Sequence, residues 1–166
     1  ACKNQGYDEA ADFNRLGNDG FTLKTLGENL LIAGGCRGIL YGVYELLEKL
    51  GCRFFTPTCE KIPALDLVEL PSMDETQVPI LEHRDHWYRF YNDYPQFAVK
   101  SRINGNYKGL DEKLGGHISY AWHVHSFSHI LPPEEYYDTH PEYFSLVNGK
   151  RLRERPQPCF TNPDVL

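Results

Sequence analysis

The alternation of apolar and polar positions predicts a β-hairpin in the first quarter of the chain. Residues Phe21 to Thr25 (FTLKT) alternate as expected for a strand with one buried face, Gly27 to Asn29 supply a turn, and Leu30 to Gly34 (LLIAG) return. Two strands joined by so short a turn pair with each other. The first layer of the fold is therefore expected to be an antiparallel sheet.

A helix is predicted directly after this hairpin, in the segment RGILYGVYELLEKLG. Glu45 lies four residues before Lys49, an ion-pair spacing on one helix face, and Gly51 is a natural stop. The apolar side chains at helical spacing are Ile39, Leu40, Val43, Leu46, Leu47 and Leu50. The helix is expected to cover one face of the sheet, which makes an α+β layer.

Three glycines, Gly34, Gly38 and Gly42, recur every four residues along the start of this helix. They would line one stripe, where the helix backbone approaches the sheet closely. The alternative is a phosphate-binding loop. Because GGCRG lacks the P-loop lysine and the GxGxxG spacing, we expect the stripe to serve packing.

Further strands are predicted over Cys52 to Pro57 and over Leu65 to Pro71. From Pro79 the composition changes, because ILEHRDHWYRFYNDYP is crowded with His, Arg, Asp and aromatic residues. We place a domain boundary there, between an accessory α/β domain of residues 1–78 and a second domain of residues 79–166.

The second half of the chain carries weaker local signals. They indicate a helix around Gln96 to Arg102, a strand over Tyr120 to Phe127 (YAWHVHSF), and short helical turns that begin at Pro133 and Pro141. The dipeptide Asn148–Gly149 is a strong signal for a type I′ hairpin turn.

Length and charge exclude several classes of function. The 166 residues are too few for a whole (β/α)8 barrel, which needs about 250. The net charge is −6, and no run of Lys and Arg is suited to a phosphate backbone, so we expect no nucleic-acid partner. No apolar stretch approaches the roughly 20 residues of a membrane helix, so we expect no membrane span. Five cysteines are an odd number, so at least one is unpaired within the chain. Cys52 and Cys59 either form a disulfide bridge across a turn or are small buried side chains with free thiols.

The segment from Glu82 to Arg89 is predicted as a strand whose alternate residues face opposite sides. As an inner barrel strand it would point Arg84 inward, where a guanidinium fork suits sugar hydroxyls or a carboxylate. Arg84 is equally suited to be a buried partner of an acidic residue, and both roles stay open. Glu82 and Asp85 resemble the carboxylate pair of a glycosidase, but acids so close on one strand mostly face apart, so we expect no catalytic role for them.

Aromatic and histidine side chains supply the remaining candidate chemistry. The rings from Trp87 to Tyr94 suit either stacking of pyranose rings or packing between domains. His123 and His125 fall on one face of the predicted strand. They suit metal binding, hydrogen bonding to sugar hydroxyls or a place in the core, and no third ligand for zinc is evident. Asn104 and Asn106 flank Gly105, as in a turn closed by local hydrogen bonds.

Five sequence blocks together resemble a known family of bacterial proteins, the domain-of-unknown-function 4838 family, part of which is classed as glycoside hydrolase family 163. The blocks are GENLLIAGG, RGILYGVYELLEKLGCRFFTP, RINGNY, LPPEEYYDTHPEYFSLVNGKR and PCFTNPDVL. The resemblance implies a domain like the one before the barrel of β-hexosaminidases and α-glucuronidases, and then the first part of a (β/α)8 barrel. It also implies cleavage of β-N-acetylglucosaminide linkages in glycans by a secreted, periplasmic or cell-surface bacterial protein.

The resemblance places sugar-binding positions at Arg84, Asn104, Asn106 and His125, and the aromatic crowding adds Trp87. It leaves the catalytic acids unassigned and implies no cofactor and no metal. The expected partners are an oligosaccharide and either the remainder of the same barrel or a second copy of the chain. We expect an N-terminal fragment of a glycoside hydrolase that is inactive alone, the alternative being a non-catalytic glycan-binding or structural module.

Overall fold

The computed structural model describes residues 10–105, 109–122 and 124–165, which form two compact units. The first unit extends to Ser119 and the second begins at Tyr120. The predicted boundary at residue 79 concerns the domains of a larger protein and stays a prediction. In this structure residues 79–119 belong to the same compact unit as the accessory segment.

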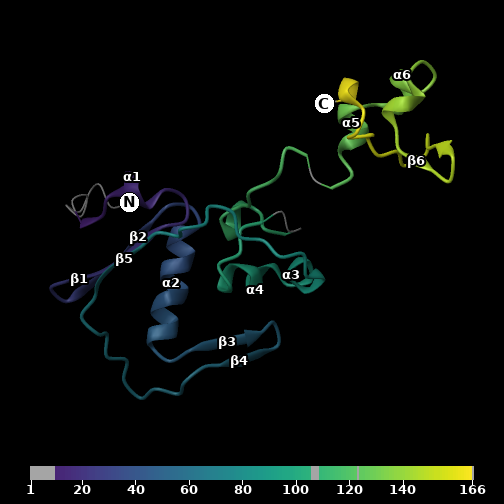
Figure 1. The fold of residues 1–166 in the computed structure, drawn as a ribbon. Helices are drawn as coiled ribbons and strands as arrows, with labels where there is room; N and C mark the ends of the chain where they lie inside the picture. The colour runs from purple at the N-terminus through teal and green to yellow at the C-terminus, as the bar shows by residue number, and fades with distance from the viewer. Residues whose placement is uncertain (1–9, 106–108, 123, 166) are drawn as a thin grey trace. The chain divides into compact units, whose positions relative to one another are not determined.

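The first unit is built on a three-stranded antiparallel sheet with the strand order β2-β1-β5 (Figure 1). Strands β1 (Phe21–Leu26) and β2 (Asn29–Gly34) form the predicted hairpin, with Phe21 opposite Gly34. On its other side, β1 pairs with β5 (Asp74–Gln77). A short helix, α1 (Phe13–Leu16), precedes the sheet, and Asp12 caps its first turn. The antiparallel sheet and the α+β class are therefore confirmed.

Helix α2 (Gly38–Lys49) forms where the sequence predicts it and packs on β1 and β2. The glycine stripe is confirmed as the contact, because a Cβ on Gly38 would overlap the backbone oxygen of Gly20. The face that turns inward is the one carrying Gly38, Tyr41 and Gly42, all of which are buried. Ile39 and Val43, two of the apolar side chains at helical spacing, are 46% and 38% exposed and lie off this face.

The rest of the first unit consists of one hairpin and short helices. Strands β3 (Arg53–Thr56) and β4 (Cys59–Lys61) form the hairpin, and α3 (Arg89–Asp93), α4 (Pro95–Lys100) and the 3-10 helix η3 (Glu112–Leu114) follow. The core joins the sheet, α2 and α4. Its buried members are Phe21, Leu23, Tyr41, Met73, Tyr91, Phe97, Ala98, Val99, Ile103 and Leu110.

The second unit is small and mostly irregular. It contains α5 (Phe127–Ile130), α6 (Pro133–Tyr136), the strands β6 (Leu146–Val147) and β7 (Lys150–Arg151), and the 3-10 helices η4 (Pro141–Tyr143) and η5 (Pro163–Val165). The turns at Pro133 and Pro141 are confirmed. So is the hairpin turn, because Asn148 and Gly149 have φ values of 49° and 77°, as a type I′ turn requires.

Three predicted strands are wrong: residues 65–71, 82–89 and 120–127 form no strand where the structure describes them. A strand is stable only when its backbone groups pair with a neighbouring strand. The ladder beside β1 is instead supplied by the polar segment of β5. Every strand pair in the described ranges is antiparallel, and the barrel part of the fold class stays a prediction.

Two smaller expectations concern cysteines and membranes. Cys52 and Cys59 are both free thiols, with Cys52 buried, so the possible bridge between them is not formed. Within the part of the chain that the structure describes, no helix combines the length and the apolar character needed to cross a membrane.

We predict that Gly38→Ala destabilises the protein by about 3 kcal/mol, because the new methyl group would overlap the backbone oxygen of Gly20, the residue directly before β1. An exposed helical glycine would instead gain about 1 kcal/mol from the same change. Urea unfolding followed by circular dichroism measures the difference.

Gly42→Ala is the graded control for this prediction. Its Cβ would lie 2.8 Å from Cγ2 of Ile32, a longer approach than the 1.9 Å between a Cβ on Gly38 and the Gly20 oxygen, so a smaller loss is expected. Equal stability of Gly38→Ala and the unsubstituted chain would contradict the close approach of α2 to the backbone of Gly20.

Candidate functional site

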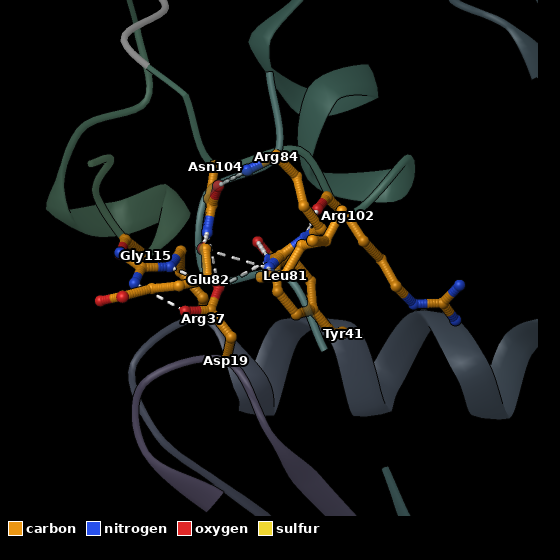
Figure 2. A network of polar contacts seen from close by, with 9 residues as sticks. All are labelled: Asp19, Arg37, Tyr41, Leu81, Glu82, Arg84, Arg102, Asn104 and Gly115. Atoms are coloured by element: carbon orange, nitrogen blue, oxygen red, sulfur yellow. Dashed lines mark hydrogen bonds and ion pairs between the residues drawn. The ribbon is translucent and has the colours of Figure 1, made fainter. Parts of the chain in front are cut away.

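The Asp19 carboxylate is the centre of a polar network in the first unit (Figure 2). Asp19 lies in the turn before β1. Its Oδ1 accepts hydrogen bonds from Nε of Arg37 at 2.7 Å, Nη2 of Arg84 at 2.8 Å and Nδ2 of Asn104 at 3.2 Å. Its Oδ2 accepts one from Nη2 of Arg37 at 2.8 Å. One carboxylate thus joins the first turn of the unit to two segments more than 60 residues away.

Arg37 reaches Asp19 from the N-cap position of α2. A cation at this end of a helix meets the positive end of the helix dipole and is disfavoured unless an anion lies beside it. The bidentate pair with Asp19 supplies that anion, and Nη1 of Arg37 also donates to the Gly115 carbonyl at 3.4 Å. An arginine at a helix start is the one sequence signal that pointed to this ion pair, which our sequence analysis missed.

All three guanidinium nitrogens of Arg84 donate within the network. Nε donates to the Arg102 carbonyl at 2.7 Å, Nη1 to the Leu81 carbonyl at 2.7 Å, and Nη2 to Asp19. The side chain also lies over the Tyr41 ring, with Cζ 5.7 Å from its centroid. The structure thus shows Arg84 paired with an acidic residue, Asp19, and its role in sugar binding stays a prediction.

Asn104 is brought together with Arg84 by two reciprocal hydrogen bonds. Oδ1 of Asn104 accepts from the Arg84 amide at 2.8 Å, and the Asn104 amide donates to the Arg84 carbonyl at 3.1 Å. Its Nδ2 also donates to the Glu82 carbonyl at 2.8 Å. Because the Asn104 side chain is 0% exposed, its contacts in this structure are all internal. The predicted site residue Asn106 lies outside the described residues.

The electrostatics of the network keep Asp19 ionised. Burial by itself would raise the pKa of this carboxyl, but the hydrogen bonds from Arg37 and Arg84 outweigh burial and hold the pKa below its usual value of 3.8. Burial raises the pKa of the Tyr41 hydroxyl, with the Asp19 charge adding to it. A carboxylate held ionised between two arginines has no proton to donate, which suits a structural role and not that of a general acid.

Two cavities adjoin this network within the first unit. One, of about 510 Å³, is lined by Asp19, Arg37, Arg84 and the segment from Val78 to Glu82, among others. The other, of about 200 Å³, lies by Tyr41 and Arg102. Both are bordered by Arg84, whose guanidinium donates to the Asp19 carboxylate and to backbone carbonyls.

The Glu82 and Asp85 carboxylates have different surroundings. Glu82 is exposed, whereas the Asp85 side chain is 7% exposed and its Oδ2 lies 3.8 Å from Nε2 of His83. Asp85 packs against Gly105, where any Cβ would overlap its carboxylate. The two acids are thus not equivalent groups facing one cleft.

Tyr88 is the exposed part of an aromatic cluster that also includes His86, Phe90, Tyr91 and Phe97, and Trp87 directly precedes it in the chain. Trp87 is 64% exposed and Tyr88 65%, whereas Tyr91 is buried and stacks on Phe97 with ring centroids 5.6 Å apart. The Tyr88 ring stacks on Phe90 at 5.9 Å. The cluster therefore serves packing at its base, and the Tyr88 ring and the neighbouring Trp87 ring lie on the surface.

His125 belongs to the second unit, just before α5. It lines a cavity of about 580 Å³ together with Ser128, Arg155 and Gln157, of which the last three were not singled out from the sequence. His123, its predicted companion, lies outside the described residues. Over the described ranges, no group of three or more His, Cys, Asp or Glu side chains is arranged to hold a metal ion.

Comparison with known proteins gives one family. The model of the family described as "Domain of unknown function (DUF4838)" matches residues 54–166. No curated protein matches the chain. No solved structure matches it either.

We predict that Asp19→Asn lowers the free energy of unfolding by about 3 kcal/mol, because it leaves two partly buried arginines without their anion. Thermal and urea unfolding of the two chains measure the loss. Asp74→Asn is the matched control. Asp74 pairs with Lys24 on the surface, with its side chain 74% exposed, so this change should cost less than about 1 kcal/mol.

The lowered pKa of Asp19 also predicts a dependence of stability on pH. A carboxyl whose pKa is lower in the folded than in the unfolded state contributes its full stabilisation when the pH is above its usual pKa of 3.8. That contribution is lost as the pH falls through the folded-state pKa. The free energy of unfolding should therefore drop below about pH 4. Asp19→Asn should show a shallower drop, and parallel curves for the two chains would contradict this assignment.

Proposed function

The chain belongs to the domain-of-unknown-function 4838 family, and from this premise we propose that it is part of a glycoside hydrolase acting on glycans that contain β-N-acetylglucosaminide linkages. The substrate class rests on the resemblance of the quoted sequence blocks to glycoside hydrolase family 163. On this proposal residues 79–166 begin a (β/α)8 barrel, and the catalytic acids belong to other parts of the parent protein. A glycan substrate of this kind fits a secreted, periplasmic or cell-surface protein.

The exposed pair Trp87 and Tyr88 is the observation that carries the proposal. Flat apolar rings with polar edges suit the apolar faces of pyranoses, and both rings are about two-thirds exposed although their neighbours Tyr91 and Phe97 are buried. The buried stack below holds the backbone that presents them. We assign sugar stacking to Trp87, with Tyr88 beside it.

Arg84 and Asn104 contribute to this surface as positioning residues on our proposal. The network fixes the backbone at Arg84, three residues before Trp87, by hydrogen bonds on both its amide and its carbonyl. Arg84, one of the sugar-binding positions implied by the family resemblance, is thus close in sequence to the exposed rings. Asn106 and His125 remain proposed sugar contacts.

The alternative is a glycan-binding module without catalysis. It is favoured by the different surroundings of Glu82 and Asp85, which do not form an equivalent pair of acids across a cleft. In that case no barrel would pack on the exposed apolar side chains of the segment after β4, and another partner would have to cover them. These side chains are Ile62, Leu65, Leu67, Val68 and Leu70. On the hydrolase proposal the remainder of the parent protein covers them, and a second copy of the chain is the other candidate.

We predict that the parent protein hydrolyses a chromogenic β-N-acetylglucosaminide or N-glycan oligosaccharides, whereas the 166-residue chain does not. Trp87→Ala in the parent should raise KM about fivefold, corresponding to the loss of about 1 kcal/mol of ring stacking. Steady-state kinetics and glycan release measure both effects.

Trp122→Ala is the matched control, because Trp122 is 62% exposed and lies in the second unit. The same rise in KM for both variants would contradict the assignment to Trp87. Glycan binding by a parent protein that shows no turnover would favour the module. The absence of both binding and turnover would refute both functions.

A further inference from the structure

The cavity of the second unit differs from the Asp19 network in having polar side chains without internal partners. Its lining comes from two segments, with His125 and Ser128 at the start of α5, and Arg155 and Gln157 after β7. Within the described ranges, none of these four side chains makes a hydrogen bond or an ion pair with another residue. By contrast, Arg151 donates to the Phe144 carbonyl at 2.7 Å.

Two of the four lining residues have a left-handed backbone. His125 has a φ of 64° and Arg155 a φ of 47°. Side chains other than glycine rarely adopt this conformation, and for Arg155 it is less favourable still because Pro156 follows and disfavours helical backbone. The turn at Asn148 requires a positive φ, but Arg155 lies in no such hairpin turn. Strain of this kind is typical of functional sites, where side-chain placement outweighs backbone preference.

The strained backbone at Arg155 is held from both sides. The next residue, Pro156, is buried, and the Gln157 carbonyl accepts a hydrogen bond from the Ser145 amide at 2.9 Å. The bridge between Phe144 and Pro158 continues this contact. Arg155 is therefore an exposed cation on an anchored segment, which lowers the entropy cost of binding a ligand.

The lining side chains together define the class of ligand. A guanidinium fork matches the two oxygens of a carboxylate or sulfate, and the hydroxyl, amide and imidazole groups of Ser128, Gln157 and His125 suit neighbouring sugar hydroxyls. The volume of about 580 Å³ lies within the range of small-molecule sites. We propose that this cavity binds an acidic sugar unit, with the oxyanion of the sugar on Arg155.

This inference rests on the proposed function only in taking a sugar as the ligand. Its test measures binding and not hydrolysis, so each proposal fails separately. The 166-residue chain is titrated with glucuronate and with glucose, and binding is followed by NMR. The two sugars differ at one position, where glucuronate has a carboxylate and glucose has a hydroxymethyl group. We predict chemical-shift changes at the four lining residues and at least about tenfold tighter binding of glucuronate, as expected for one charge-assisted bidentate pair.

A second arm compares N-acetylglucosamine 6-sulfate with N-acetylglucosamine. Preference for either acidic sugar over its neutral counterpart supports the proposal, and the larger preference identifies the oxyanion as carboxylate or sulfate. Equal binding of the acidic and neutral sugars in both arms overturns it. So does equal binding of inorganic sulfate and the sulfated sugar, because the sugar hydroxyls would then contribute nothing.

Arg155→Gly separates binding from folding. Glycine adopts a positive φ without strain, so the melting temperature should stay the same or rise while the preference for the acidic sugar disappears. Arg153→Gln is the control for charge, because Arg153 pairs with Asp138 and does not line the cavity. Asn148→Gly is the control for backbone strain. Both controls should keep the preference.

Retention of the preference by Arg155→Gly overturns the proposal. A lower melting temperature together with lost binding also overturns it, because Arg155 would then act by holding the fold. His125→Gly is the companion variant. It should weaken binding of acidic and neutral sugars alike, since imidazole is assigned to the hydroxyl groups.

Discussion

The Asp19 carboxylate is the constraint on which the first unit depends. It is one anion that accepts hydrogen bonds from two guanidinium groups and an amide, and these come from the start of α2 and from the segments around Arg84 and Asn104. The segments are distant in sequence, and the Asp19 carboxylate binds all three of them. Because the ions are partly buried, the net gain from forming the network is modest, but removing its one anion leaves two unpaired cations. The network therefore specifies the arrangement more than it adds to stability.

Arg84 and Arg155 show how the same side chain can either stabilise the fold or stay available for a ligand. Arg84 directs every nitrogen of its fork at protein oxygens, so nothing of its hydrogen-bonding capacity remains for a ligand in this structure. Arg155 is exposed, has no partner among the described residues, and is held on a strained but anchored backbone. Sequence alone does not distinguish these cases, since both are arginines in polar surroundings. What distinguishes them is whether long-range packing has satisfied the donors.

The sequence predicted the elements whose stability is local. The hairpin of β1 and β2, helix α2 and the turn at Asn148 depend on neighbours within a few residues, and all three form. The strand expected over 82–89 depended on a partner that the sequence does not specify. The segment is irregular instead, and Arg84 donates to main-chain oxygens within and beside it. For the pair of Arg37 with Asp19, the only sequence signal was a cation at the start of α2, and Asp19 itself carried none.

The network also reconciles the family resemblance with the geometry. The resemblance implies that Arg84 and Asn104 matter to sugar binding, yet Asn104 is buried and the hydrogen bonds of Arg84 are internal. Both facts are compatible if these residues act through the backbone. The segment they fix leads within three residues to Trp87, whose ring is exposed, and then to Tyr91, which is anchored in the core. A rigid attachment on both sides of an exposed aromatic pair presents the rings without the entropy cost of ordering a loop. On our proposal, Arg84 and Asn104 thus act by fixing the backbone beside the exposed rings of Trp87 and Tyr88.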